Sequence, residues 1–516
     1  MNNTRNSLNI TYLSIIQGIY VVLIGIGLPI IVRDSYFDIL LTKYYFYWIS
    51  TVIMIVLSAI YFIAKKDKNI FDKGVKNQIF VQDYAVLLFF LVAIISTLSS
   101  SYRYESFWGN EGRYTGLFLL GLYVLSYFLV SRFLVYRNFY IDAILATGMF
   151  VCVFGITDFF QMDILNFKKN VITNQLNIFT STIGNINAYT SYVAMIMAIS
   201  TVLFATAKEI KKMVLYYLCM VVSFFAIIMG VSDNAYISIA ALFLFLPLYL
   251  FSIKRGVQRF LIILATFFSV IQITAWINIS FGDIVVGIDS LFNYIANSGV
   301  LPYFIGVLIC LIVFLNFIES KIDLKCRRGV SWKKGIWLVL ISLTTLLIVY
   351  ILYDCNVLGN VQRYGSLGTY LLFNDEWGTH RGYIWRKAIE QFKEYSLWKK
   401  MVGFGPDTFG ILLMNKTYGN PYNEVFDAAH NEYLQFLLTV GIVGVTSYVV
   451  FIIAYIRRCF SCVNKNPYMI AMVFGVICYS AQAFVNLSVP VVTPFFWLLL
   501  GIGSSISMKD NKNTIN

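Results

Sequence analysis

The sequence contains few charged residues. Asp, Glu, Lys and Arg make up 13% of its 516 residues, whereas 59% are hydrophobic and the mean hydropathy is +0.74. A soluble globular domain carries about 25% charged residues, which cover the surface that it exposes to water. The composition therefore excludes an ordinary soluble domain and predicts a polytopic integral membrane protein.

Histidine is rare, and the cysteines form no framework. The chain has two histidines, His380 and His430, and eight cysteines, which are scattered within or beside apolar stretches. A thiol in such a place behaves as a small hydrophobe. Cys459 and Cys462 form a lone C-x-x-C pair with no second pair or histidine beside it, so no zinc site is predicted. We expect no metal and no cofactor.

Long apolar stretches fill most of the chain. A helix needs about 20 apolar residues to cross a hydrocarbon core that is about 30 Å thick. The sequence predicts an all-α bundle of about fourteen transmembrane spans, with about twelve as the alternative. The spans are expected at residues 12–32, 44–64, 83–101, 116–131, 139–160, 185–206, 214–231, 235–252, 260–279, 299–318, 336–353, 431–456, 467–485 and 488–507.

The net charge of +13 would suggest a nucleic-acid partner in a soluble protein. Here the basic residues gather in alternate loops, where they fix orientation during membrane insertion, so no nucleic acid is expected. The loops that are richer in Lys and Arg should be cytoplasmic, which places both termini of this cell-membrane protein in the cytoplasm. They carry Lys65, Lys66, Lys68, Lys73, Lys76, Lys208, Lys211, Lys212, Lys254, Arg255, Arg259, Arg327, Arg328, Lys333, Lys334, Arg457 and Arg458, against Arg33, Lys43, Arg103, Arg113, Lys168 and Lys169 opposite.

One extracytoplasmic loop is far longer than the other connections. Residues 1–353 form the bundle of the first eleven expected spans, 354–429 form this loop, and 430–516 form the last three spans and a short cytoplasmic tail. Loops of this length are usually functional. Within it, the apolar spacing of 385–398 predicts an amphipathic helix on the membrane surface, and 403–410 predicts a turn.

His430 is the first candidate for catalysis, because it opens the helix that is expected after the long loop. The partial positive charge of a helix N-terminus favours a neutral imidazole, which can accept a proton as a general base. A histidine at this position can also cap the helix or anchor it at the interface. Position alone leaves both interpretations open.

Arginines of the long loop are candidates for binding phosphate. Arg363, Arg381 and Arg386 carry guanidinium groups, which pair with phosphate oxygens in a bidentate way. Arginines beside tryptophans also serve as interfacial anchors, and this alternative stays open.

An earlier outer segment, residues 108–116 (WGNEGRYTG), combines aromatic side chains, glycines and an arginine. Aromatic faces stack on sugar rings, so Trp108, Arg113 and Tyr114 are candidates for the wall of a sugar site. Residues 184–187 (GNIN) place two amides at a helix start, where the amides can also act simply as caps.

Residues 379–410 (THRGYIWRKAIEQFKEYSLWKKMVGFGPDTFG) and 427–444 (DAAHNEYLQFLLTVGIVG) resemble the O-antigen ligase superfamily of membrane glycan transferases. The family shows R-G-x-I-W in an outer loop, then a G-x-G-P-x-T-F turn, then H-N-x-Y-L at a helix start. The W-G-x-x-x-R-Y-x-G run at 108–116 and the G-N-x-N run at 184–187 are weaker family traits. Only the segment from about 365 to 444 is strongly diagnostic.

The resemblance implies a metal-independent, inverting transfer of a glycan from an undecaprenyl-diphosphate-linked donor to a hydroxyl of a glycan or glycolipid acceptor, at the outer membrane face. Both ligases and polymerases of cell-surface polysaccharide biosynthesis catalyse this step. His430 resembles the family's base and Arg381 the arginine that neutralises the leaving diphosphate. Asp427 and Asn431 are expected to support them. The implied architecture is the lipid-linked glycosyltransferase (GT-C-like) type, in which the outer loop caps a lateral opening for the lipid.

The sequence departs from the family at one place. Members often carry an arginine at the outer start of a mid-chain helix, whereas residues 231–235 read VSDNA here, so Arg113 or Arg363 would have to substitute. A polysaccharide transporter or flippase is the main competing interpretation, but its spans usually contain charged residues. Here the spans are almost free of charge, with Asp158 and Asp233 near ends.

A metal-dependent oligosaccharyltransferase is a third interpretation, which requires outer carboxylates arranged as metal ligands. No D-x-D pair occurs among the carboxylates that are available there, which are Asp375, Glu376, Asp407, Glu424 and Asp427.

Overall fold

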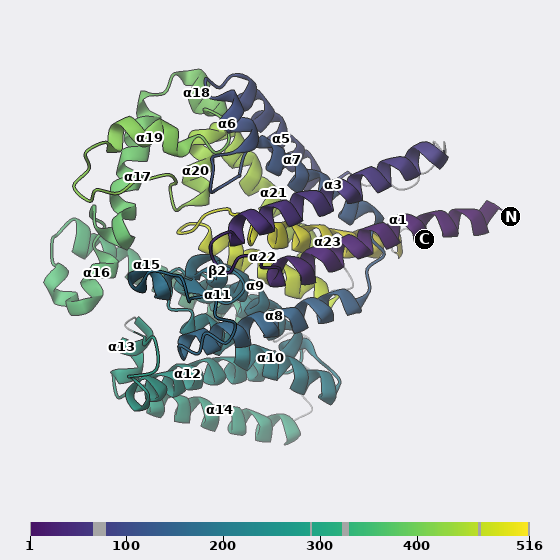
Figure 1. Cartoon of the computed structure of the whole chain (residues 1–516). Coiled ribbons are helices and arrows are strands. Elements are labelled where there is room, and N and C mark those ends of the chain that lie inside the picture. The colour runs from purple at the N-terminus through teal and green to yellow at the C-terminus, as the bar shows by residue number, and fades with distance from the viewer. Residues whose placement is uncertain (1, 66–78, 289–290, 322–329, 463–465, 514–516) are drawn as a thin grey trace.

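The computed structural model of the chain describes residues 2–65, 79–288, 291–321, 330–462 and 466–513. In these ranges the fold is helical (Figure 1), apart from one antiparallel pair of two-residue strands, β1 (Phe179–Thr180) and β2 (Gly184–Asn185). The expected all-α class is confirmed.

Nine helices in the described ranges are long and apolar enough to cross a membrane, or ten if α13 and α14, which are bent by 80°, form one span. Four more apolar helices are shorter. Each expected apolar stretch overlaps one of these helices, and the chain is a multi-pass membrane protein. The spans comprise α1 (Asn2–Val22) with η1 (Leu23–Gly27) and α2 (Leu28–Ile30), α3 (Ile39–Lys65), α5 (Val81–Leu98), α8 (Asn138–Phe159), α9 (Ile186–Thr206), α10 (Ile210–Met229), α12 (Gly256–Ser280), α13 (Leu291–Asn297) with α14 (Leu301–Lys321), α15 (Val330–Asn356) and α21 (Gly441–Ser461). The shorter ones are α7 (Leu117–Phe133), α11 (Ala235–Leu250), α22 (Pro467–Gln482) and the apolar part of α23 (Thr493–Asn513), which ends at Met508.

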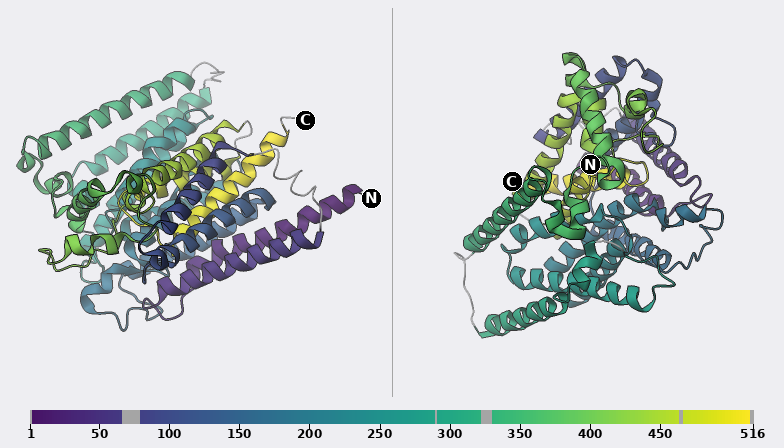
Figure 2. Two further views of the ribbon diagram at one scale, coloured as in Figure 1. Left: turned by 90° about the horizontal axis from the view of Figure 1, so that it is seen from above. Right: turned by 90° about the vertical axis from the view of Figure 1, so that its left-hand side faces the viewer.

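The apolar helices run alongside one another (Figure 2). A separate set of short elements, of 4 to 18 residues, gathers at one end of the bundle. We call the end that carries α16 to α20 the loop end, and the end where α1 begins and α23 ends the terminal end (Figure 1). The short elements are α6 (Arg103–Trp108), η2 (Thr173–Ile178), η3 (Val361–Leu367), α16 (Gly368–Leu371), α17 (Trp377–Glu394), α18 (Leu397–Val402), α19 (Phe409–Thr417) and α20 (Glu432–Thr439).

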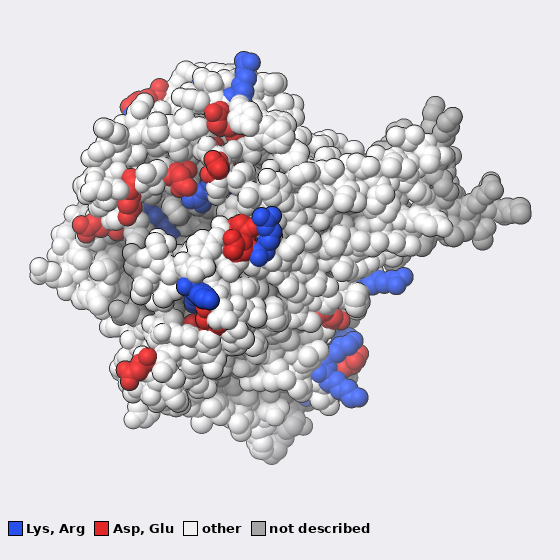
Figure 3. Space-filling model, in the orientation of Figure 1, with Lys and Arg blue, Asp and Glu red and all other residues white. Residues whose placement is uncertain are grey.

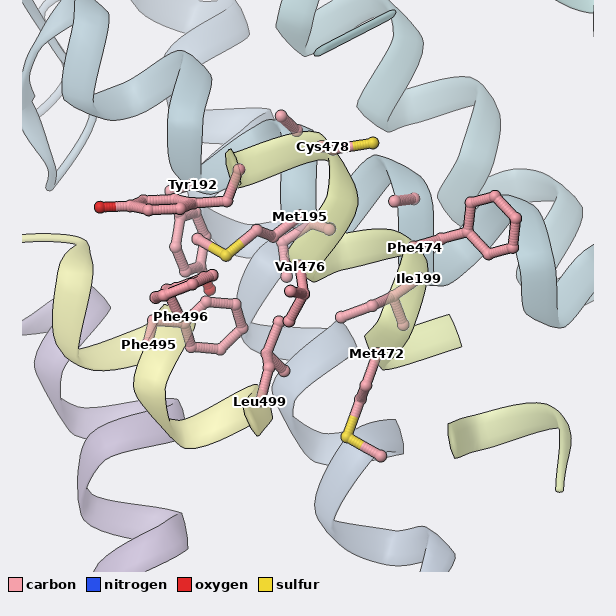
Figure 4. Packing of buried hydrophobic residues seen from close by; sticks show 14 of the residues in the cluster. Tyr192, Met195, Ile199, Met472, Phe474, Val476, Cys478, Phe495, Phe496 and Leu499 are labelled. Carbon is pink, nitrogen blue, oxygen red and sulfur yellow. The ribbon is translucent and has the colours of Figure 1, made fainter. Parts of the chain in front are cut away.

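The centre of the bundle is α9, whose apolar window is entirely buried. Figure 4 shows Met195 and Ile199 of α9 among side chains of α22 and α23, such as Val476 and Leu499. The equivalent window of α15 has no buried residue, so this helix lies at the edge of the bundle, where lipid would cover it.

The last part of the long loop and the following span differ from the prediction. Instead of one helix over 431–456, the structure has α20, a break at Val440, and then α21 from Gly441, which has φ +73°. The chain at Gly403, which has φ +79°, packs directly against this break. A Cβ on Gly403 would collide with the backbone before Gly441, and a Cβ on Gly441 would collide with the backbone before Gly403. The predicted turn at 403–410 is confirmed, and it is the contact with this turn that divides the span.

The predicted helix over 385–398 also differs. Its residues are shared between α17, which ends at Glu394, and α18, which begins at Leu397. Trp385 and Phe392 pack against a second core cluster, formed within the loop end by α17, α19, α20 and the segment before α20. Ile389 remains exposed. The apolar face of α17 is therefore turned largely toward protein.

Charged side chains within apolar helices are more numerous than the sequence suggested. Lys43, assigned to a loop, lies buried in α3, where its Nζ donates to the carbonyls of Leu28 (2.6 Å) and Pro29 (3.0 Å). Asp83 in α5 and Asp142 in α8 lie near helix ends and are also hydrogen-bonded. Of the basic residues used for orientation, Lys66, Lys68, Lys73, Lys76, Arg327 and Arg328 lie outside the described residues.

Candidate functional site

His430 lies at the loop end, two residues before α20 begins. Its backbone is left-handed, with φ +47°. The cap of α20 is the next residue, Asn431, whose side chain accepts a hydrogen bond from the backbone N–H of Leu434 at 3.0 Å. Capping is thus carried out by Asn431, and the alternative in which His430 serves as the cap is wrong.

The surroundings of His430 keep its imidazole neutral. Burial lowers the pKa of His430 to about 4, and the nearby guanidinium groups of Arg113 and Arg381 act in the same direction, whereas the carboxylate of Asp427 opposes them. At neutral pH the ring is therefore an acceptor for a proton.

Arg381 approaches His430 from α17. It directly follows Gly378, Thr379 and His380, which have φ of +61°, +57° and +65°. Such backbone is costly for residues other than glycine and is found where function or packing requires it. Burial lowers the pKa of Arg381, and the Asp233 carboxylate, from the segment before α11, opposes this shift. In the described part of the chain, neither the Arg381 guanidinium nor the His430 ring makes a hydrogen bond.

Arg113 and Asp427 form a bidentate ion pair beside His430. The Arg113 Nε donates to Asp427 Oδ2 at 3.0 Å, and a terminal nitrogen donates to Oδ1 at 2.7 Å. Burial opposes ionisation of Asp427, but the hydrogen bonds and charge of Arg113 outweigh it, so the pKa of Asp427 is lowered. The pair joins the 108–116 segment to the long loop.

Figure 3 shows the face of the loop end that carries these elements. It is hollowed, with basic atoms on the floor of the hollow and acidic side chains around its rim. Such a surface favours a ligand whose negative charge is presented deep in the hollow.

Asp407 fixes the 108–116 segment against the long loop, a role that the sequence did not suggest. Its Oδ2 accepts hydrogen bonds from the backbone N–H groups of Asn110 (2.8 Å) and Thr115 (3.0 Å), and its carbonyl accepts from the Asn110 amide at 2.9 Å. Burial raises the pKa of Asp407 to about 6, although these hydrogen bonds oppose the shift. The only sequence signal was a carboxylate inside the 403–410 turn.

We expect Asp407→Ala to lower the stability of the protein by about 2–4 kcal/mol, because it leaves two partly buried N–H groups without an acceptor. The midpoint of thermal unfolding in detergent measures this loss. Asp407→Asn is the matched control, since its side-chain oxygen can still accept, and it should lose less. Equal melting temperatures for Asp407→Ala and the parent would contradict the anchoring role.

The other two candidate arginines are held by carboxylates elsewhere in the loop. Arg386 pairs with Asp375 through bonds of 2.6 and 3.0 Å and with Glu390 at 3.1 Å. Arg363 pairs with Asp354 at the end of α15, at 3.3 Å. Neither the Arg386 nor the Arg363 guanidinium is among the charged groups that shift the pKa of His430.

The aromatic candidates pack against the bundle. Tyr114 stacks on Tyr44 of α3, with ring centroids 4.7 Å apart. Trp108 contacts Phe107 and Phe118 and keeps 43% of its surface exposed. Of the two rings, Trp108 therefore retains the larger free face for a ligand.

The second histidine is engaged within the loop. The His380 ring stacks on Tyr422, with centroids 3.7 Å apart, and its Nδ1 lies 3.1 Å from Glu424. The amides expected at 184–187 act as caps in part, because the Asn185 side chain accepts from the backbone N–H groups of Asn187 and Ala188.

An apolar cavity of about 800 Å³ extends to Tyr433, three residues after His430. Tyr433, on the first turn of α20, lines one end of it, and Phe460, at the far end of α21, lines the other. From Val445 to Phe460 the helix alone extends about 22 Å. The remaining wall is mostly apolar and comes mainly from α11, α21 and α22, with residues such as Phe245, Val449, Ala481 and Phe484, although Ser252, Lys334 and Ser480 also line it.

Comparison of the chain with protein-family models and with curated proteins finds no match. Within the described residues, no group of three or more His, Cys, Asp or Glu side chains is placed to hold a metal ion. The functional argument therefore depends on the geometry of the loop end and on the motifs in the sequence.

Proposed function

We propose that this chain is a membrane glycosyltransferase of the O-antigen ligase type, which transfers or polymerises a glycan from an undecaprenyl-diphosphate-linked donor. The acceptor is a sugar hydroxyl of a glycan or glycolipid. One observation carries the proposal: the imidazole of His430 is neutral and makes no hydrogen bond in the described chain, and the guanidinium groups of both Arg113 and Arg381 lie near enough to lower its pKa.

These three groups suit an inverting displacement. The acceptor hydroxyl gives its proton to the neutral imidazole as its oxygen attacks the anomeric carbon of the donor sugar. The bond from this carbon to the phosphate oxygen breaks on the opposite side, and the diphosphate leaves. Guanidinium groups stabilise the negative charge that develops on it. The imidazolium then returns its proton to solvent.

Arg113 is better placed than Arg363 to act as the second arginine. Where members of the O-antigen ligase superfamily often carry an arginine, the chain has Asp233, whose carboxylate acts on the pKa of Arg381. Arg113, in the 108–116 segment, lowers the pKa of His430, whereas Arg363 is paired with Asp354. In this proposal Asp427 orients Arg113 through their bidentate pair.

The apolar cavity suits the polyprenyl chain of the donor. It begins at Tyr433, three residues after His430, and follows α21 along the bundle, so a diphosphate at the arginines and a hydrocarbon tail in the cavity are compatible with one ligand. The proposed donor would enter laterally from the bilayer.

The proposed architecture is GT-C-like, with about fourteen spans in the cytoplasmic membrane. Nine or ten helices meet the length requirement, and the four shorter apolar ones would complete the set. Because α1 begins and α23 ends at the same end of the bundle (Figure 1), both termini would lie on one side of the membrane. The distribution of Lys and Arg among the loops would make this side cytoplasmic, so the loop end would face outward.

Transfer by the purified protein from undecaprenyl-diphosphate oligosaccharide to an acceptor glycan tests the proposal, with EDTA in parallel. We expect a product whose new linkage has inverted configuration, at equal rates with and without EDTA. Loss of the product with EDTA would support a metal-dependent transferase. Movement of intact donor across proteoliposomes without bond cleavage would support a flippase.

The rate of transfer should depend on pH through His430. Because its pKa is lowered to about 4, the imidazole is a base at pH 5 and above, and the rate should fall only as pH drops through about 4. A pH profile of kcat/KM measures this limb. A midpoint near 6.5, the ordinary value for histidine, would contradict the environment described for His430.

Ala481→Trp should fill the apolar cavity and raise KM for the undecaprenyl donor about tenfold or more. A donor with a short, ten-carbon chain should be affected far less, since it needs less of the cavity. Leu343→Trp, on the exposed surface of α15, is the matched control. Equal effects of Ala481→Trp on both donors would contradict a role in tail binding.

A further inference from the structure

A second cavity, of about 440 Å³, lies at the terminal end between the beginning of α5 and the last turns of α21. Gly441 begins α21 at the loop end, and Arg458 follows 17 positions later, which corresponds to about 26 Å along the helix. The cavity is therefore separate from the His430 cluster. Its lining consists of Phe80, Val81, Gln82, Val450, Ile453, Ala454, Arg457 and Arg458.

Arg458 brings an uncompensated charge to this cavity. All three nitrogens of its guanidinium are shielded from solvent and have no hydrogen-bond partner in the described chain. One face of the group lies over the Phe80 ring, 3.0 Å from its centroid. A cation–π contact satisfies that face but leaves the N–H groups at the edge unpaired, and a buried charge in that condition costs several kcal/mol.

In the described part of the chain, the acid that acts on Arg458 is Asp83, and it is already paired. Asp83 accepts hydrogen bonds from Arg132 at 2.6 Å, from the Tyr127 hydroxyl at 3.0 Å and from the Phe80 N–H at 2.9 Å. Arg132 and Asp83 thus neutralise each other, and Arg458, with exposed Arg457 beside it, leaves the pocket positive. An anion would complement it.

The rest of the wall indicates what kind of anion fits. Val81, Val450 and Ile453 are apolar, exposed and located on membrane-spanning helices. A ligand that places one phosphate against Arg458 and hydrocarbon along these side chains satisfies both parts of the wall. We propose that this cavity binds the phosphate headgroup of an anionic phospholipid of the leaflet at the terminal end, independently of glycan transfer.

Native mass spectrometry of the full-length protein in detergent tests this site, with phosphatidylglycerol, phosphatidylcholine or inorganic phosphate added. We expect phosphatidylglycerol to bind, and Arg458→Gln to weaken that binding about tenfold or more. Arg137→Gln removes an exposed arginine from the same end and should bind like the parent. Ala454→Phe keeps Arg458 but fills the cavity, so it should also weaken binding, which guards against misfolding of the Arg458 variant.

Three results would overturn the proposal. The first is equal retention of phosphatidylglycerol by the parent, Arg458→Gln and Ala454→Phe. The second is phosphatidylcholine binding as tightly as phosphatidylglycerol, because the site would then not select for net charge. The third is displacement of the lipid by millimolar inorganic phosphate, which would make the ligand a free anion. None of these binding measurements depends on whether the protein transfers glycan.

Discussion

Replacing His430 by alanine is expected to lower the rate of the proposed glycan transfer by about 10²–10⁴-fold, the range that general-base catalysis contributes. The neutral imidazole makes no hydrogen bond in the described chain and is therefore available to the acceptor hydroxyl. Its loss should appear in kcat more than in the KM for the donor, because the proton moves only in the transition state. Steady-state kinetics with purified protein measure both.

His380→Ala provides the matched control for this change. His380 belongs to the same loop, but its ring is stacked on Tyr422 and its Nδ1 faces Glu424. We expect its replacement to leave kcat within a few fold of the parent. If His430→Ala transferred glycan as fast as His380→Ala, the assignment of the base would be wrong.

Arg381→Ala is expected to lower kcat by about 10²–10³-fold, as removal of a single stabilising donor does in other enzymes. The guanidinium is partly buried and makes no hydrogen bond in the described chain, so it is free to receive the diphosphate as its charge develops. Arg381→Lys should recover only part of the rate, since an ammonium keeps the charge but not the bidentate geometry.

Arg33→Ala is the control for Arg381. Arg33 also lies at the loop end, but its side chain is 83% exposed and pairs with Asp38 at 3.3 Å. Its loss should leave kcat unchanged. The account of the leaving group would be contradicted if Arg381→Ala kept the parent's kcat while its melting temperature was also unchanged.

Much of the fold could be predicted because the bilayer imposes a length on each apolar stretch. The expected spans overlap helices of the structure, including the short α22 and α23. What failed depends on tertiary contact. The break at Gly441 arises because the 403–410 turn packs against the chain there. Lys43 can lie inside α3 because the carbonyl oxygens of Leu28 and Pro29 in α2 accept hydrogen bonds from its ammonium group. Neither the break at Gly441 nor the burial of Lys43 can be predicted from hydropathy.

The candidate site was only partly accessible from the sequence. The motifs supplied His430, Arg381, Arg113 and Asp427, and the structure brings these four together. The sequence left Arg113 and Arg363 as equal alternatives, because which arginine meets the histidine depends on how the 108–116 segment docks. That docking is fixed by Asp407, whose partners are distant in sequence.

The most direct test is a cryo-electron microscopy structure of the protein with a bound, non-hydrolysable undecaprenyl-diphosphate glycan. We predict density for the diphosphate between Arg113 and Arg381, with the anomeric carbon next to a water or acceptor oxygen in reach of His430, and the polyprenyl chain along α21. Diphosphate density at the terminal end, or away from both arginines, would contradict the account.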